Sequence, residues 1–154
     1  MGRFVLVLGL ALGLALGLAL ALAGCGGDGD EQLSRAEFVE QAEAICNRAE
    51  ERLGELGEPG SIEELEAYAQ EAQAITDDSV AELRELEPPG PLQEGFDRYL
   101  ERAEEVIGLL DELEQAAGSG DAVESSRIAA EIGDSAEAGD AARAAGIPGC
   151  ESEG

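Results

Sequence analysis

The stretch that decides the fold is residues 34–56, SRAEFVEQAEAICNRAEERLGEL, in which apolar side chains recur at steps of three and four. That spacing gathers them on one side of an α-helix, and no segment after Leu33 alternates apolar and polar residues as a strand would. The pattern therefore predicts an amphipathic helix within an all-α domain. The expected buried stripe consists of Phe38, Ala42, Ile45, Ala49, Leu53 and Leu56.

Both ends of this helix carry recognisable signals. Ser34 and Glu37 are spaced as a capping box, in which the two residues exchange hydrogen bonds between side chain and backbone. Leu33 and Phe38 occupy the two positions of a hydrophobic staple. The sequence GEPG at 57–60 then supplies the glycines and the proline that end a helix.

Two further helices with the same apolar spacing follow. The second begins at Ser61, which can cap its first turn, and stops at Pro88-Pro89 because proline cannot continue the hydrogen-bond ladder. The third begins at Pro91, a residue suited to the first helical turn, and stops before Gly118-Ser119-Gly120. Their expected stripes are Leu65, Tyr68, Ala72, Ile75, Ser79, Leu83 and Leu86 in the second helix, and Leu92, Phe96, Tyr99, Ala103, Val106, Ile107, Leu110 and Leu113 in the third.

A fourth helix is expected over residues 121–145, where Asp121 supplies an acidic cap. Its only large apolar residues are Val123, Ile128 and Ile132, and the rest of its inner face is Ala, Gly and Ser. Each of its two internal glycines weakens it by about 1 kcal/mol relative to alanine. We therefore predict that the fourth helix is the least stable element.

The helix lengths and connections together predict the fold class. Long helices joined by short connections pack as antiparallel neighbours. Residues 34–154 are therefore expected to form an up-and-down antiparallel bundle of four helices. A three-helix core with a loosely docked or broken fourth helix is the alternative.

Residues 1–24 have a different composition from the rest of the chain. Arg3 is their only charge, and an unbroken apolar run follows from Phe4 to Gly24. A charged start, an apolar run and a small-residue end are typical of a secretory signal peptide. Because the run is also long enough to span a bilayer, a retained transmembrane anchor and ordinary secretion are the alternatives.

The apolar run ends in Leu22-Ala23-Gly24-Cys25, which resembles the lipobox of bacterial lipoproteins. The resemblance implies cleavage between Gly24 and Cys25 and attachment of a diacylglycerol to the Cys25 sulfur. Residues 25–33 then form a short flexible tether rich in glycine and acidic residues. On this interpretation the domain is extracytoplasmic, and its N-terminal lipid anchors it to the outer face of the cell membrane.

The two remaining cysteines, Cys46 and Cys150, form an even pair in an exported domain, which predicts a disulfide. On the chain-entropy model, a crosslink that closes about 100 residues is worth roughly 4.7 kcal/mol. Cys46 lies roughly 18 Å along its helix, whereas a full-length fourth helix would end near the start of the first. The bond therefore requires the fourth helix to end early, to break near Gly139 or to fold back. Free thiols and intermolecular pairing are the alternatives.

The charge balance excludes several functions. The chain of 154 residues carries 35 Asp and Glu against nine Arg, with no Lys and no His, for a formal net charge of -26. Such a chain cannot neutralise phosphates, which excludes nucleic acid as a partner. The lack of histidine removes the usual general base and the commonest metal ligand.

No residue pattern predicts a catalytic, metal or cofactor site. Ser125 and Ser126 have no His or Lys near them in the sequence, and Tyr68 and Tyr99 fall on buried stripes. The carboxylates are expected to form a solvated acidic surface, with weak divalent-cation binding as the alternative. We therefore expect no enzymatic activity and no cofactor.

Two segments of the domain, taken with the lipobox, define a second resemblance. The segments are Phe38-x-x-x-Ala42-x-x-Ile45-Cys46 and Gly146-Ile147-Pro148-Gly149-Cys150. With them the chain is similar to the small uncharacterised helical lipoproteins of high-GC Gram-positive bacteria, which offer no established activity to transfer.

The expected function is a non-enzymatic interaction or structural module at the cell envelope. Its partners would be the membrane, through the lipid on Cys25, and an unknown envelope protein or cationic ligand. The alternative is an acidic binding protein for divalent cations or a cationic ligand.

Overall fold

The structure is a computed structural model that describes residues 33–133 and 136–151, without the side chains of 136–138. Every regular element in this part of the chain is helical, which confirms the prediction of an all-α fold. The lipobox at 22–25, the rest of the predicted signal peptide and most of the tether lie outside the described residues. The elements are α2 (Arg35–Leu56), α3 (Ile62–Arg84), α4 (Gly90–Gly118), α5 (Ala122–Gly133), α6 (Ala136–Ala145) and the short 3-10 helix η1 (Pro148–Cys150).

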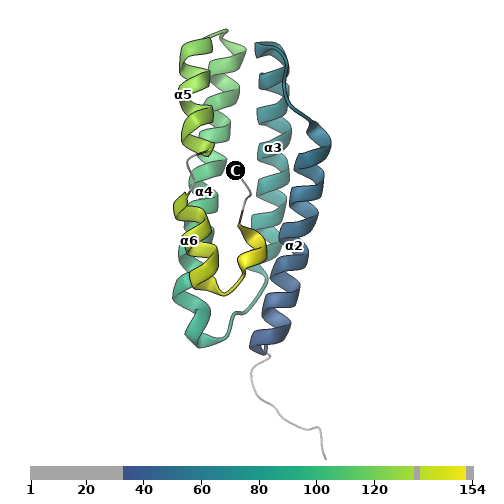
Figure 1. Ribbon diagram of the computed structural model, residues 1–154, viewed down its shortest axis with the longest axis vertical. Helices are drawn as coiled ribbons and strands as arrows, with labels where there is room; N and C mark the ends of the chain where they lie inside the picture. The colour runs from purple at the N-terminus through teal and green to yellow at the C-terminus, as the bar shows by residue number, and fades with distance from the viewer. Residues whose placement is uncertain (1–32, 134–135, 152–154) are drawn as a thin grey trace, which may run out of the picture. The chain divides into compact units, whose positions relative to one another are not determined.

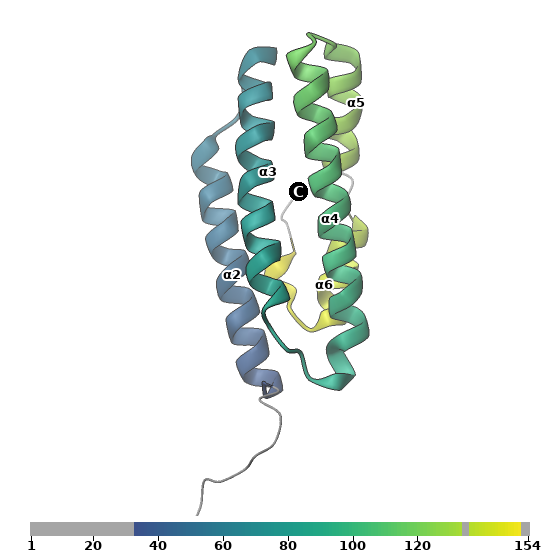
Figure 2. The same cartoon turned by 180° about the vertical axis from the view of Figure 1, so that it is seen from behind.

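Helices α2, α3 and α4 run up and down as antiparallel neighbours, and α5 and α6 follow one another along α4 (Figures 1 and 2). The prediction of a helical bundle is therefore confirmed, and the expected fourth helix is described as two helices, which corresponds to the alternative of a broken fourth helix. The first half ends at Gly133 and the second begins at Ala136, whereas Gly139, the expected break, lies inside α6. In the described residues α5 packs mainly against α4, while α6 packs against α4 and η1.

The helix starts follow the capping chemistry in the sequence. At the start of α2, the Glu37 amide donates to Ser34 Oγ at 3.3 Å, and the Ser34 amide donates to the Glu37 carboxylate at 3.0 Å. Ser61 caps α3 in the same way, accepting from the Glu64 amide at 3.2 Å. The Glu64 carboxylate, however, accepts from the amide of Gly60 at 2.6 Å. Three of these four hydrogen bonds are those that a capping box predicts.

The buried apolar side chains form two separate clusters. The large core joins α2, the end of α3, the start of α4, α6 and η1, and the Phe38 and Phe96 rings meet edge to face in it with centroids 5.1 Å apart. The small core lies between α3, α4 and α5. The large core consists of Phe38, Ala42, Ile45, Cys46, Leu83, Leu92, Phe96, Ala142, Ala145, Ile147 and Cys150, and the small core of Ala69, Leu113, Ala116 and Ile128.

The structure shows how the alanine-rich second half of the fourth segment packs, and the predicted low stability of this segment stays a prediction. Ala142 and Ala145 of α6 have no exposed surface, and both belong to the large core. The close approach of α6 to α4 explains their burial: a Cβ atom on Gly95 would lie only 2.5 Å from the carbonyl oxygen of Ala144. Val123 of α5, expected to be among its inward apolar residues, is instead 84% exposed.

The described core belongs to one compact unit of the chain, Glu31–Gly154. Both clusters and the residues that pack against them lie within 33–151. A fragment that starts at Glu31 therefore keeps every residue of the two cores. None of the described helices is both long enough and apolar enough to cross a membrane.

Candidate functional site

The most distinctive chemical feature of the domain is a buried disulfide between Cys46 on α2 and Cys150 at the end of η1. The two sulfur atoms lie 1.99 Å apart and the Cα atoms 5.2 Å apart, across a sequence separation of 104. The cysteines are only 6% and 7% exposed. The bond therefore ties the end of the described chain to the middle of the first helix, within the large core.

A tight turn after α6 brings Cys150 back to α2. Gly146 has a φ of 75°, a left-handed conformation that glycine adopts readily. The Ile147 amide then donates to the Ala142 carbonyl at 3.0 Å, and the Gly146 amide to the Arg143 carbonyl at 3.0 Å. Of the three routes that the sequence left open, the structure shows the fold back at Gly146, whereas Gly139 lies inside α6.

Side chains of α2 and α4 surround the disulfide. The Gly149 amide donates to the Glu43 carboxylate at 3.1 Å, and a Cβ atom on Gly149 would lie 2.9 Å from Glu43 Cγ. Tyr99 places its hydroxyl 3.8 Å from Cys46 Sγ. Burial, as the larger cause, and the negative charge of Glu50 together raise the pKa of Tyr99 to about 12. The sequence placed Tyr99 on a buried stripe but gave no signal that it would touch the disulfide.

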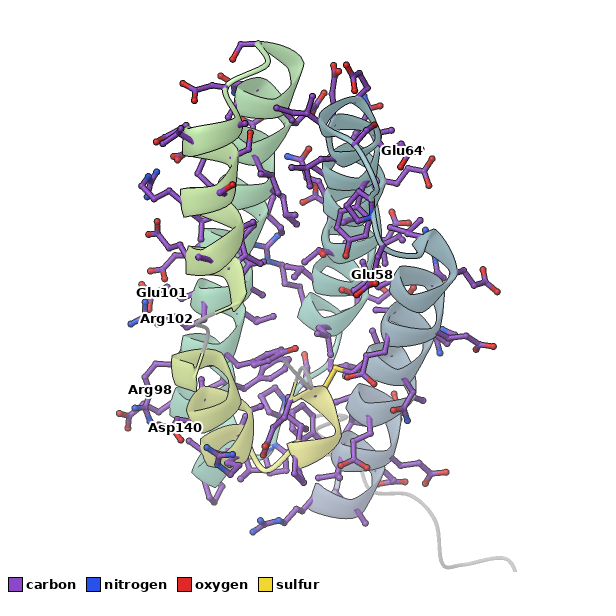
Figure 3. All side chains as sticks on the ribbon, turned by 45° about the horizontal axis from the view of Figure 1, so that its top comes forward. Glu58, Glu64, Arg98, Glu101, Arg102 and Asp140 are labelled. Carbon is purple, nitrogen blue, oxygen red and sulfur yellow. A yellow bond between two sulfur atoms is a disulfide. The ribbon has the colours of Figure 1, made fainter. Side chains whose placement is uncertain are left out.

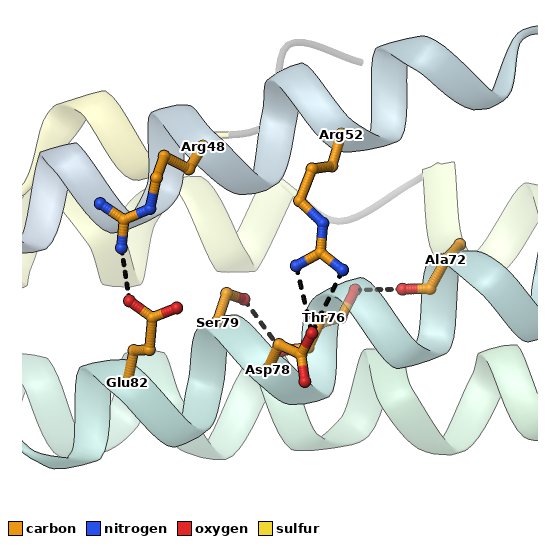
Figure 4. Close-up of polar contacts among 7 residues, drawn as sticks. All are labelled: Arg48, Arg52, Ala72, Thr76, Asp78, Ser79 and Glu82. Atoms are coloured by element: carbon orange, nitrogen blue, oxygen red, sulfur yellow. Dashed lines mark hydrogen bonds and ion pairs between the residues drawn. The ribbon is translucent and has the colours of Figure 1, made fainter.

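Arginine–carboxylate pairs connect the helices at the surface. Arg52 of α2 donates to Asp78 of α3 from both terminal nitrogens, at 3.1 and 3.2 Å, and Arg48 pairs with Glu82 one turn away (Figure 4). Arg84 of α3 pairs in turn with a carboxylate of α4. Because these side chains are about half exposed, such pairs contribute little to stability.

Among the hollows on the described surface, two lie beside α4. The first, about 260 Å³, separates α4 from α6 and mixes charges of both signs (Figure 3). The second, about 320 Å³, runs between α4 and α5 and contains carboxylates but no cation. Arg98, Glu101, Arg102, Asp140 and Ala141 line the first; Glu112, Gln115, Ala116, Ser119, Asp121, Glu124 and Ile128 line the second.

The residues that sequence reasoning weighed for chemistry are engaged in the helix backbone. Ser125 is 1% exposed and donates to the Asp121 carbonyl at 2.8 Å, while Ser126 donates to the Ala122 carbonyl at 2.7 Å. Within the described residues, no group of three or more His, Cys, Asp or Glu is arranged to hold a metal ion. The predicted cleavage and lipidation residues, Gly24 and Cys25, lie outside the described part.

Comparison of the chain with protein-family models, with curated proteins and with solved structures gives no match. The case for a function therefore comes from the chain's own residues. Of those that the structure describes, the disulfide and the surface around α5 carry the most information.

Proposed function

We propose that this protein is a lipid-anchored, extracytoplasmic helical module that acts through non-enzymatic interactions at the cell envelope. The observation that carries the proposal is the buried Cys46–Cys150 bond. Disulfides form and persist in oxidising compartments, outside the cytoplasm. The bond uses two of the three cysteines, and the third, Cys25, ends the motif that resembles a lipobox. Both features favour export.

Chemical composition and local contacts support a non-enzymatic role. The chain has no His and no Lys, so the commonest general bases for activating a nucleophile are missing. The hydroxyls of Ser125 and Ser126 donate to backbone carbonyls instead of facing a base. The hollows beside α4 are lined mostly by charged and polar side chains, whereas pockets that enclose a small molecule are mostly apolar.

The helix directions give the module two different ends. The start of α2, which follows the predicted tether in the sequence, lies close to the turn between α6 and η1 (Figure 1). The turn that joins α4 to α5 lies at the opposite end of the bundle (Figure 1). The end with the α4–α5 turn is thus opposite the helix start that follows the predicted tether in the sequence, and we propose that a partner in the envelope contacts this end.

A pair of cysteine variants tests the proposal. Cys25→Ala in the full chain should abolish incorporation of a labelled fatty acid and release the protein from the membrane or leave an unprocessed precursor. Cys150→Ala is the matched control, because it removes the disulfide and should still be acylated. Continued acylation of Cys25→Ala, or normal processing of it, would refute the lipid anchor.

The alternative function is binding of divalent cations or another cationic ligand. The hollow between α4 and α5 favours it, because Glu112 and Asp121 line that hollow and its third carboxylate, Glu124, already attracts the cation of Arg127. Calorimetric titration of the fragment 31–154 with calcium separates the two. Saturable heat at micromolar calcium supports the cation-binding function, and weak heat that does not saturate contradicts it.

A further inference from the structure

Helix α5 is attached less firmly than the helix that follows it. Its buried residues are Ser125 and Ile128, while Ile132 is half-buried and Val123 is exposed to solvent. Helix α6, by contrast, sits in the large core and is followed directly by the disulfide. One large aliphatic side chain therefore accounts for most of the apolar burial that holds α5.

Both ends of α5 contain glycine. Gly120, just before the helix, has a φ of 75°, in the left-handed region that favours this residue. Gly133 is the last residue of the helix, and a Cβ atom added there would meet nothing within 4 Å. Because Cys150 fixes α6 and η1 independently, α5 is able to leave α4 without breaking the disulfide.

The small core, to which α5 contributes Ile128, is apolar and extends over α3 and α4. Ala69 of α3 and Leu113 of α4 are at most 2% exposed while α5 is in place. Leu65 and Leu109 pack against the same cluster, one turn away on each helix. Two antiparallel helices with aligned aliphatic residues form the kind of surface that accepts the apolar face of one amphipathic helix.

The charges beside this surface are negative. The chain has no Lys or Arg over residues 53–83 or 103–126, which include the residues that α3 and α4 contribute to the small core. On one side, the Glu66 carboxylate lies against the end of α4, since a Cβ atom on Gly118 would be 3.0 Å from Glu66 Oε1. On the other side, Glu112 lines the hollow next to Ile128.

Arg127, the one basic residue of α5, does not pair with Glu66 or Glu112. Arg127 pairs with Glu124 at 2.8 Å and with Glu131 at 2.6 Å, both on α5 itself. A helix with an apolar stripe could cover the same cluster as α5. If it also carried several Lys or Arg side chains, it would pair with the neighbouring carboxylates, which α5 does not do.

We propose that α5 is a displaceable helix, and that the small-core residues of α4 and α3 left behind when Ile128 withdraws dock a cationic amphipathic helix of a partner protein. The inference rests on the proposed interaction role and names the site and the class of partner. Displacement makes the apparent affinity depend on the fraction of molecules in which α5 is open. Variants that change only the docking of α5 therefore change binding without touching the docking surface.

The test uses the oxidised fragment 31–154 and a synthetic helical peptide with leucines at steps of three and four and lysines elsewhere. Ile128→Ala weakens the docking of α5 and should tighten the peptide's apparent dissociation constant by roughly tenfold or more. Val123→Ala is the matched control, because Val123 lies on the same helix but is 84% exposed. It should bind like the unmodified fragment.

Three outcomes would overturn the proposal. A scrambled peptide of the same composition that binds as tightly would reveal diffuse charge attraction. Unchanged affinity of Ile128→Ala would show that α5 is not displaced. Formation of a dimer in which two molecules exchange their α5 helices would show that a second copy of this chain, not a partner protein, binds the docking surface.

Ile128→Val is a milder variant that keeps the test valid if Ile128→Ala does not fold. It should also tighten the apparent dissociation constant of the peptide, but by less than Ile128→Ala. Because the fragment lacks Cys25, the result is independent of the lipidation test.

Discussion

The contact between α4 and α6 can be tested by adding a single methyl group. Gly95 of α4 is buried, and a Cβ atom there would lie 2.5 Å from the carbonyl oxygen of Ala144 and 2.7 Å from the amide nitrogen of Ala145. These are backbone atoms of α6, and α6 cannot move away freely because Cys150 holds the chain that follows it. We therefore expect Gly95→Ala to destabilise the domain.

The expected magnitude follows from two opposing effects. Alanine is favoured over glycine inside a helix by about 1 kcal/mol. Overpacking a closely packed contact costs about 1–3 kcal/mol, and the rigid backbone neighbour places Gly95→Ala near the upper value. The net loss of stability is then about 2 kcal/mol. Gly108 lies on the same helix with nothing within 4 Å of an added Cβ atom, so Gly108→Ala should gain about 1 kcal/mol.

Thermal unfolding of the oxidised fragment 31–154, followed by circular dichroism, measures both variants. A difference of about 3 kcal/mol corresponds to a separation in Tm on the order of 10 °C for a domain of this size. Reduction should narrow the separation, because α6 is then freer to move away from α4. If Gly95→Ala melts at or above the temperature of the unmodified fragment, α6 does not pack this closely and the reasoning fails.

Two further predictions concern the disulfide and its neighbour. Reduction, or Cys150→Ser, should raise amide hydrogen exchange over residues 136–150 before it affects α2, α3 and α4, whereas uniform loss of protection would reveal a single cooperative unit. Burial raises the pKa of Tyr99 from its ordinary value of 10.0 to about 12. The neutral Tyr99 side chain therefore adds to the free energy of unfolding; this contribution is complete below pH 10.0 and is lost as the pH rises through about 12. The phenolate absorbance of Tyr68→Phe, which leaves Tyr99 as the only tyrosine, should thus appear later than that of a free tyrosine; ionisation near the ordinary pKa with the fold intact would contradict it.

The sequence predicted three helices well because their signals agree with one another. The serine caps at Ser34 and Ser61 accept the hydrogen bonds that their spacing indicated. The apolar steps of three and four identified Phe38, Phe96 and Leu83, which are among the most buried side chains. Caps and periodicity are local properties, so one sequence is enough to detect them.

The alanine-rich fourth segment could not be predicted in the same way. Ala142 and Ala145 carry little information in a hydrophobic pattern, because the burial of an alanine depends on how near the neighbouring backbone comes. The approach of α6 depends on Gly95, which lies about fifty residues earlier in the sequence. Val123 shows the opposite error, since a large apolar residue at the start of a helix faces solvent.

The cysteine pair shows what counting residues can and cannot predict. An even number of cysteines after Cys25 pointed to a bond between Cys46 and Cys150, and the structure contains that bond. The path of the chain depends instead on the left-handed turn at Gly146 and on the complete burial of Ile147. Both are consequences of packing against the large core, which no local pattern reports.

The position of the disulfide decides which part of the fourth segment is fixed. Because Cys150 follows α6, the bond holds α6 and η1 to α2, and α5 relies on its own contacts in the small core. A disulfide formed from α5 instead would have held both halves of the segment in place, and the small core with Ala69 and Leu113 would have stayed closed. An oxidised domain with the bond where it is can keep its large core closed while α5, on our proposal, gives way to a partner. Covalent closure and one movable helix are therefore compatible in this fold, because they act on different halves of the same segment.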